Sequence, residues 1–205
     1  SFSSNNIDTE IGIPTAITFD MRAAAQFNIE NGIAAMALAQ ISGASNDEIK
    51  AAMASFKGVD RRFDFKIKND KVVLLSDYAH HPEEIKQSIL SMRALYKDKK
   101  ITGIFQPHLY TRTRDFYQEF ADSLSLLDEV ILTEIYPARE LPIEGISSHL
   151  IYDHLHPGVE KELCKKEDLL DLLKQKKIEV LMTLGAGDIE NYVHKHAFVC
   201  PDWVK

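Results

Sequence analysis

The feature that most constrains the fold is an alternation of strand-like and helical patterns after residue 60. Short apolar runs occur at 72–76, 101–105, 130–135 and 178–184. Amphipathic stretches with apolar residues at helical spacing separate these runs. Strands spaced by helices are typical of βαβ units, in which the strands pair in parallel. The sequence therefore predicts an α/β fold with a mostly parallel sheet.

The first 60 residues carry a different pattern. Residues 28–42 have apolar side chains at helical spacing, and Ser45 and Glu48 have the spacing of a capping box at the start of a second helix. We expect a helical hairpin that belongs to a larger domain. Short apolar runs within 11–19 predict an edge strand or a truncated element. These patterns place a domain boundary near residue 60, between segments 1–60 and 61–205.

Composition limits the function classes. Lys and Arg number 24 against 31 Asp and Glu, which gives a net charge of −7 and argues against a nucleic-acid partner. No apolar run reaches the roughly 18 residues of a membrane span, so no membrane partner is expected. The two cysteines, Cys164 and Cys200, form no disulfide framework or zinc motif, which fits a reducing, cytoplasmic location.

Polar side chains follow the predicted strands at the point where each strand ends. Asp77 and His80 follow the first strand, and His108 and Arg112 follow the second. Ligands bind outside the carboxyl ends of the strands in an open parallel sheet. Imidazole and guanidinium groups gathered there would suit an anionic ligand.

Alternative interpretations of these residues stay open. Asp77 could cap a turn, and Arg114 beside Asp115 could lie on a solvated helix face. Asp77 with His80 and His81 could instead serve a metal-dependent phosphoesterase. Residues 185–187 hold only part of a dinucleotide fingerprint and could form a tight turn. The sequence lacks a GxxxxGK[ST] loop, and a non-catalytic nucleotide- or partner-binding module is a third possibility.

Several strings together resemble the Mur ligase family. They are NIENGIAA at 28–35, RRFD at 61–64, DYAHHP at 77–82, FQPHLYTRTRDF at 105–116 and TLGAGD at 183–188. The resemblance implies three domains in the whole protein. Residues 1–60 would then be the C-terminal remnant of the central ATPase domain, and 61–205 a C-terminal Rossmann-like ligase domain. The missing N-terminal and central domains would carry the phosphate loop, so the chain alone is expected to be inactive.

The resemblance also implies a reaction. The strings are most similar to family members that join L-alanine to UDP-N-acetylmuramate in peptidoglycan precursor synthesis. These ligases use ATP and Mg²⁺ to form an acyl phosphate, which the alanine amine attacks. A member that attaches murein peptide to the same UDP-sugar is the alternative within the family.

Residue roles follow from the resemblance position by position. Asn28 and Asn31 are expected to contact adenine, Arg62 to lie near the nucleotide, and Asp77 to lie near its ribose. Phe27 stands where the family commonly has histidine, which alters that adenine contact.

The resemblance assigns a second group of residues to the amino-acid side of the reaction. His80 and Arg112 are the expected catalytic pair beside the incoming alanine and the reacting carboxylate. Tyr78 and His108 are expected in the same substrate pocket. Leu109 replaces an arginine common in the family, so Arg112 gains importance.

Overall fold

The computed structural model describes residues 26–56 and 58–197. The chain divides into two compact units, Ser1–Gly58 and Val59–Lys205, and each is described by itself. The strand predicted within 11–19 lies outside the described residues, as does Cys200.

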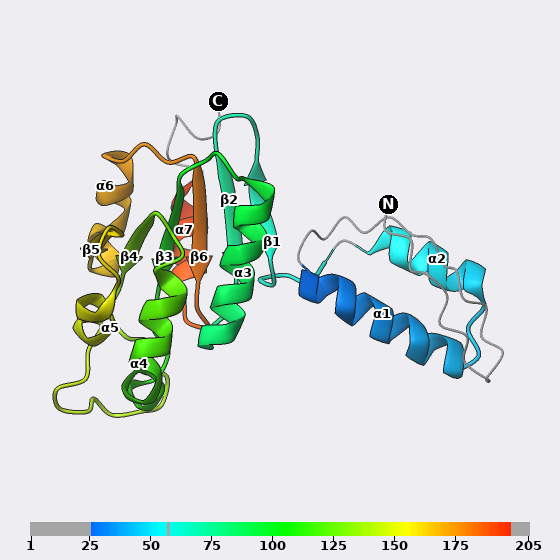
Figure 1. Cartoon of the computed structure of the whole chain (residues 1–205), viewed down its shortest axis with the longest axis horizontal. Coiled ribbons are helices and arrows are strands. Elements are labelled where there is room, and N and C mark those ends of the chain that lie inside the picture. Colours follow the sequence, from blue (N-terminus) through cyan, green and yellow to red (C-terminus); the bar gives the residue numbers. More distant parts are fainter. Residues whose placement is uncertain (1–25, 57, 198–205) are drawn as a thin grey trace. The chain divides into compact units, whose positions relative to one another are not determined.

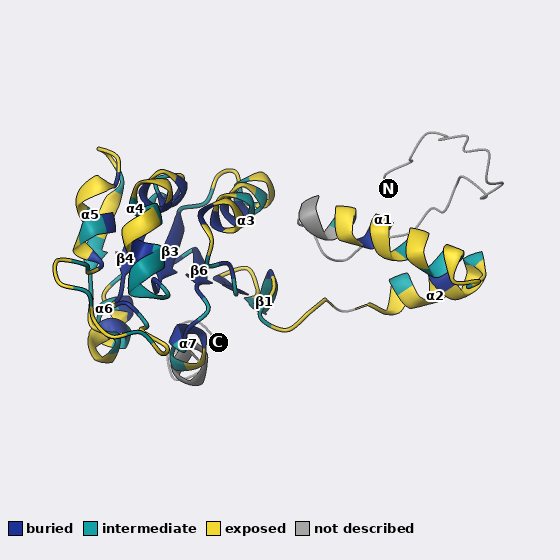
Figure 2. Cartoon of the chain, turned by 90° about the horizontal axis from the view of Figure 1, so that it is seen from below, coloured by how far each residue is buried: buried dark blue, intermediate teal, exposed yellow. Residues whose placement is uncertain are grey.

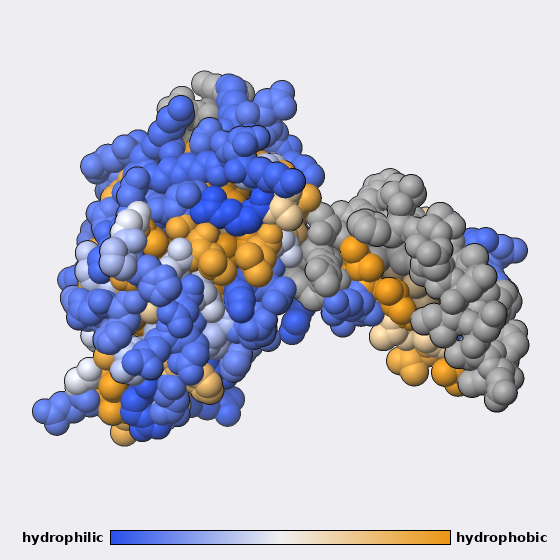
Figure 3. Space-filling view, viewed as in Figure 1, coloured by the Kyte–Doolittle hydropathy of each residue, from blue (hydrophilic) through white to orange (hydrophobic). Residues whose placement is uncertain are grey.

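The first unit contains two helices, α1 (Gln26–Ile41) and α2 (Asn46–Ser55). The predicted capping box is confirmed, because the Glu48 amide donates to Ser45 Oγ at 3.3 Å and the Ser45 amide donates to Glu48 Oε2 at 2.9 Å. Apolar side chains lie along α1 in Figure 3, and Leu38 and Ile41 are 66% and 75% exposed. The two helices therefore leave part of their apolar stripe uncovered.

The second unit is built on a six-stranded sheet with the order β1-β2-β6-β3-β4-β5 (Figure 1). The strands are β1 (Asp64–Lys68), β2 (Val73–Asp77), β3 (Ile101–Phe105), β4 (Glu129–Leu132), β5 (Glu160–Leu163) and β6 (Val180–Leu184). Only the β1–β2 pair is antiparallel, so the predicted mostly parallel α/β fold is confirmed. Strand β1 was not predicted, because its DFKIK sequence is short and largely polar.

Helices cover both faces of this sheet. They are α3 (Pro82–Leu95), α4 (Tyr110–Leu124), α5 (His149–His154), α6 (Leu169–Lys174), preceded by a 3₁₀ turn (Lys166–Asp168), and α7 (Ile189–Ala197). Figure 2 shows α3, α4 and α5 on one face and α6 and α7 on the other. Pro82 is the first residue of α3, a position that suits the fixed φ of proline. No described helix is long and apolar enough to cross a membrane.

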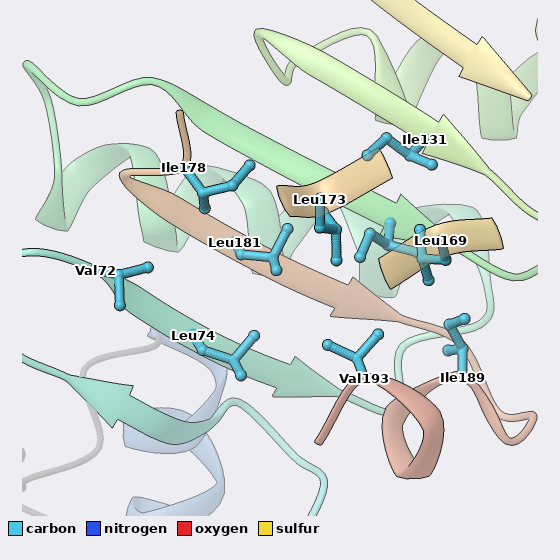
Figure 4. Close-up of a cluster of buried hydrophobic side chains, with 10 residues drawn as sticks. Val72, Leu74, Ile131, Leu169, Leu173, Ile178, Leu181, Ile189 and Val193 are labelled. Atoms are coloured by element: carbon cyan, nitrogen blue, oxygen red, sulfur yellow. The ribbon is translucent and has the colours of Figure 1, made fainter. Parts of the chain in front are cut away.

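The hydrophobic core lies between the sheet and its helices. Figure 4 shows Leu74 and Leu181 of the sheet close to Leu169, Leu173 and Val193 of α6 and α7. Strands β2, β3, β4 and β6 are buried along their whole length, which explains why their sequences are mostly apolar. Each fully buried Val, Leu, Ile, Phe or Met side chain contributes about 1.5–3 kcal/mol to the free energy of unfolding through its removal from water.

The carboxyl ends of the central strands are aligned. Strand β6, the last of the described strands, is inserted between β2 and β3, so Leu184 is level with both Asp77 and Phe105. Phe105 is in turn level with Leu132 at the end of β4. The loops after β2, β3, β4 and β6 therefore leave the sheet at one edge.

A glutamine joins two of these loops. Gln106, only 5% exposed, accepts hydrogen bonds through Oε1 from the amides of Asp188 and Ile189 at 3.0 and 3.1 Å. A Cβ atom on Gly187 would lie 2.1 Å from that oxygen, and one on Gly185 would lie 2.7 Å from the Gln106 carbonyl oxygen. Gly185 and Gly187 are thus required by a tight strand-to-helix turn. The tight turn, and not a dinucleotide fingerprint, is therefore the interpretation that fits residues 185–187.

This turn makes a stability prediction. Gly185 has φ +134° and lies against Gln106, whereas Gly158 has φ +96° and open space around it. Gly185→Ala should lower the free energy of unfolding by about 3 kcal/mol, because it adds a backbone clash to the strained φ. Gly158→Ala should cost only about 1 kcal/mol. Urea unfolding measures both, and equal losses would show that contact with Gln106 is unimportant.

Candidate active site

Four rings form a row at the carboxyl edge of the sheet. Tyr78 and His80 follow β2, His108 follows β3, and Tyr136 follows β4. Ring centroids are 5.2 Å apart for Tyr78 and His80, 6.2 Å for His80 and His108, and 5.7 Å for His108 and Tyr136. The structure therefore brings together side chains from three strand ends, as the aligned edge requires.

His80 is held in one orientation by the backbone. Its Nδ1 lies 2.9 Å from the Tyr78 carbonyl oxygen, and its amide donates to Glu84 Oε2 at 3.0 Å. A carbonyl oxygen can only accept, so we assign the proton of the neutral ring to Nδ1. The lone pair then lies on Nε2, which can accept a proton or a hydrogen bond from a ligand.

His108 lies near Arg112 and His80. Burial lowers the pKa of its imidazole, and electrostatic interactions with Arg112 and His80 lower it further, against the opposing effect of Glu140. The ring is therefore neutral near pH 7. Buried atoms without a hydrogen-bond partner in the described part of the chain include His108 Nδ1 and Arg112 Nη1. An unpaired buried polar atom is costly, so both nitrogens are candidates for contact with a ligand.

The start of α4 directs Arg112 and Arg114 differently. Leu109, at φ +72°, turns the chain into the helix, and its carbonyl oxygen accepts a hydrogen bond from the buried Thr113 hydroxyl at 2.9 Å. Arg114 is exposed and pairs with Asp115 at 2.7 Å. Arg112 instead lies near His108, so only one of the two arginines belongs to the site.

Asp77 ends β2 but both its oxygens have protein partners. Oδ2 accepts from Ser88 Oγ at 2.6 Å and Oδ1 accepts from the Ala79 amide at 3.2 Å. The side chain is buried, and this burial raises the pKa of its carboxyl group despite the hydrogen bonds. These contacts fix the strand end to α3, and the expected contact with ribose stays a prediction.

The other expected nucleotide residues lie outside this row. Arg62 is exposed in the chain between Arg61 and Phe63, both of which have positive φ. Asn31 is exposed on α1 in the first unit. Asn28 also belongs to α1, and its side chain, like that of Phe27, lies outside the described residues.

Sequence reasoning missed Arg61 as a residue of the site. Its guanidinium carbon lies 4.8 Å from the centroid of the Tyr78 ring, and Nη2 donates to the Gly187 carbonyl at 2.9 Å. Its Nε forms an ion pair with Glu190. Arg61 therefore fixes Tyr78 to the turn after β6, a role that no local signal in the RRFD string indicates.

The structure does not assemble the metal site of the phosphoesterase alternative. Asp77 is occupied by Ser88 and Ala79, and the His81 ring contacts Phe116 at 5.2 Å. Within residues 26–56 and 58–197, no three His, Cys, Asp or Glu side chains gather as metal ligands. Asp77, His80 and His81 thus have separate surroundings.

Comparison with known proteins decides the family. The sequence profile described as "Mur ligase, glutamate ligase domain" matches residues 61–187. The chain belongs to the Mur ligase family. It is 72% identical over 184 residues to UDP-N-acetylmuramate–L-alanine ligase of Phocaeicola vulgatus, and 54% identical over 187 residues to that of Parabacteroides distasonis.

These matches cover most of the chain but a smaller part of each relative. The two alignments include 90% and 91% of this chain and 38% of the length of each relative. The crystal structure of the corresponding ligase from Thermotoga maritima is similar with a TM-score of 0.72 at 27% identity. That similarity covers 87% of this chain and 39% of the other. The α/β unit thus has the fold of solved Mur ligases.

Burial of Asp77 predicts a pH-dependent stability. Its pKa is raised on folding, so its contribution is greatest below the ordinary carboxyl pKa and is lost as pH rises through the raised value. Asp77→Asn should therefore increase the free energy of unfolding at pH 7 by on the order of 1 kcal/mol, with the gain vanishing on acidification. Urea unfolding at several pH values tests this, with the exposed Asp70→Asn as the control. A gain that stays constant with pH would contradict it.

Proposed function

We propose that the full-length protein containing this chain is a cytoplasmic, ATP-dependent ligase that joins L-alanine to UDP-N-acetylmuramate. The observation that carries the proposal is the 72% identity to the ligase of Phocaeicola vulgatus across 90% of the chain. The geometry at the carboxyl edge of the sheet supports it with cationic and neutral polar groups around His108.

The proposed reaction passes through an acyl phosphate. The alanine nitrogen attacks the acyl carbonyl carbon, a C–N bond forms, and the C–O bond to phosphate breaks. The nitrogen must lose protons on the way to a neutral amide. His80 can accept one, because its Nε2 carries the lone pair once Nδ1 donates to the Tyr78 carbonyl.

Arg112 is proposed to hold negative charge in the same site. Its buried Nη1 lacks a partner among the described residues, and a guanidinium can bind a carboxylate or phosphate through two parallel hydrogen bonds. The alanine carboxylate and the acyl phosphate are both suitable anions. Neutral His108 offers a hydrogen bond beside them without adding another full positive charge.

The first unit is proposed to be the end of a central ATP-binding domain. Its uncovered apolar residues on α1 are consistent with a helix that packs in a larger domain. Asn28 and Asn31 are proposed to contact adenine, with Arg62 and Asp77 near the nucleotide. Mg²⁺ would accompany ATP in the complete enzyme.

A murein peptide ligase is the second candidate. The crystal structure of such an enzyme from Psychrobacter arcticus is similar with a TM-score of 0.65 at 18% identity, which shows a shared fold alone. The identity to alanine-adding enzymes favours L-alanine as the substrate. Offering L-alanine and murein tripeptide separately to the full-length enzyme distinguishes the two candidates.

The role of Arg112 is tested with a neighbouring arginine as the matched control. In the full-length enzyme, Arg112→Ala should lower kcat/KM for L-alanine by about 100-fold or more, since it removes a charged partner of the anion. Arg112→Lys should restore only a minor part, because an ammonium lacks the planar fork. Arg114→Ala should leave kinetics unchanged, since Arg114 pairs with Asp115 at the surface.

Phosphate release measured at varied L-alanine and saturating ATP gives these parameters. Equal kinetics for wild type and Arg112→Ala would remove Arg112 from the site. Turnover with murein tripeptide and none with L-alanine would show that murein peptide, and not L-alanine, is the substrate.

A further inference from the structure

Tyr136 contacts His108 through its backbone as well as its ring. The Tyr136 amide donates to the Pro107 carbonyl at 2.8 Å, and the Leu109 amide donates to the Tyr136 carbonyl at 3.0 Å. These bonds hold the residues on either side of His108. The Tyr136 ring is stacked on the His108 ring at 5.7 Å with an interplanar angle of 15°. Both the backbone and the ring plane of His108 are thus set by one residue.

Tyr136 is itself held by the turn after β6. A Cβ atom on Gly187 would lie 3.0 Å from Tyr136 Cγ, so the tyrosine packs directly against the glycine backbone. Gly187 is in turn bonded through its carbonyl to Arg61 Nη2 at 2.9 Å. The ring therefore lies against a part of the chain that is fixed independently of His108.

We propose that Tyr136 is a positioning residue that orients His108 toward the amino-acid substrate. The inference rests on the proposed function, which places His108 in the substrate pocket. His108 has free rotation about its side-chain bonds unless a neighbour restricts it, and its Nδ1 has no partner among the described residues to do so. Stacking on Tyr136 supplies that restriction without engaging a ring nitrogen.

The same contact helps to keep His108 neutral. The charged and titratable groups acting on it are Arg112 from α4, His80 from the loop after β2, and Glu140 from the loop after β4. Arg112 and His80 disfavour the imidazolium and Glu140 favours it, while burial has the largest effect. Because Tyr136 covers a ring face, removing its ring would return water to His108 and raise its pKa toward the ordinary value.

The first experiment measures His108 without relying on activity. NMR titration of the imidazole signals in the 205-residue chain should give a His108 pKa below the ordinary histidine value for both wild type and Tyr136→Phe. Tyr136→Ala should shift the His108 titration to higher pH. Tyr136→Leu keeps apolar volume without a flat ring and replaces Tyr136→Ala if that variant unfolds. An unchanged His108 titration in the variant lacking the ring would overturn the inference.

The second experiment measures the consequence in the full-length enzyme. Tyr136→Phe should retain wild-type kinetics, whereas loss of the ring should raise KM for L-alanine about tenfold or more and leave KM for ATP unchanged. A purely structural role would move both KM values, and that result would overturn the inference. If Arg112→Ala is impaired while the ring-lacking variant behaves as wild type, the positioning role is wrong and the proposed function stands. If Arg112→Ala is also unimpaired, the proposed site itself is wrong.

Discussion

The hydrogen bonds of Gln106 are the interaction on which the arrangement of the site depends. Strand β6 lies at the centre of the sheet between β2 and β3, and the loop that follows it must turn sharply to begin α7. The buried Gln106 side chain binds that turn at two amides and at the Asp188 carboxylate. Tyr136 and Arg61 then pack on the same turn at Gly187. Gln106, which follows β3, thus positions the turn after β6. Through that turn it also positions Tyr136 after β4 and Arg61 at the start of the unit.

The polar groups at the carboxyl edge of the sheet are of two kinds, those with protein partners and those without. Asp77 is enclosed by Ser88 and Ala79, so its carboxylate oxygens already have protein partners that fix the end of β2 to α3. His108 and Arg112 differ from Asp77, because each has a buried nitrogen without a partner among the described residues. Proteins generally pair such atoms, so an unpaired buried nitrogen calls for an explanation such as a bound ligand. This contrast distinguishes Asp77 from His108 and Arg112, the two residues proposed to contact the substrate.

Much of the fold and part of the site were predictable from sequence. Apolar runs in the sequence predicted the buried parallel strands. The alignment of strand ends predicted that His80 and His108 would lie close together, as they do. Strand β1 was missed because a short polar edge strand has little periodicity. Tyr136 was missed because its importance comes from stacking across the sheet edge, which leaves no local pattern. The roles of Asn28 and Asn31 came from resemblance alone and concern a separate unit.

The central claim is that His80, His108 and Arg112 receive the amino acid and the reacting acyl group at one edge of the sheet. A crystal structure of the full-length protein with UDP-N-acetylmuramate, L-alanine and a non-hydrolysable ATP analogue tests it most directly. The account predicts a hydrogen bond from Arg112 Nη1 to a substrate carboxylate or phosphate oxygen, with the alanine nitrogen beside His80 Nε2. Alanine bound in the complex without contact to any of these three side chains would contradict it.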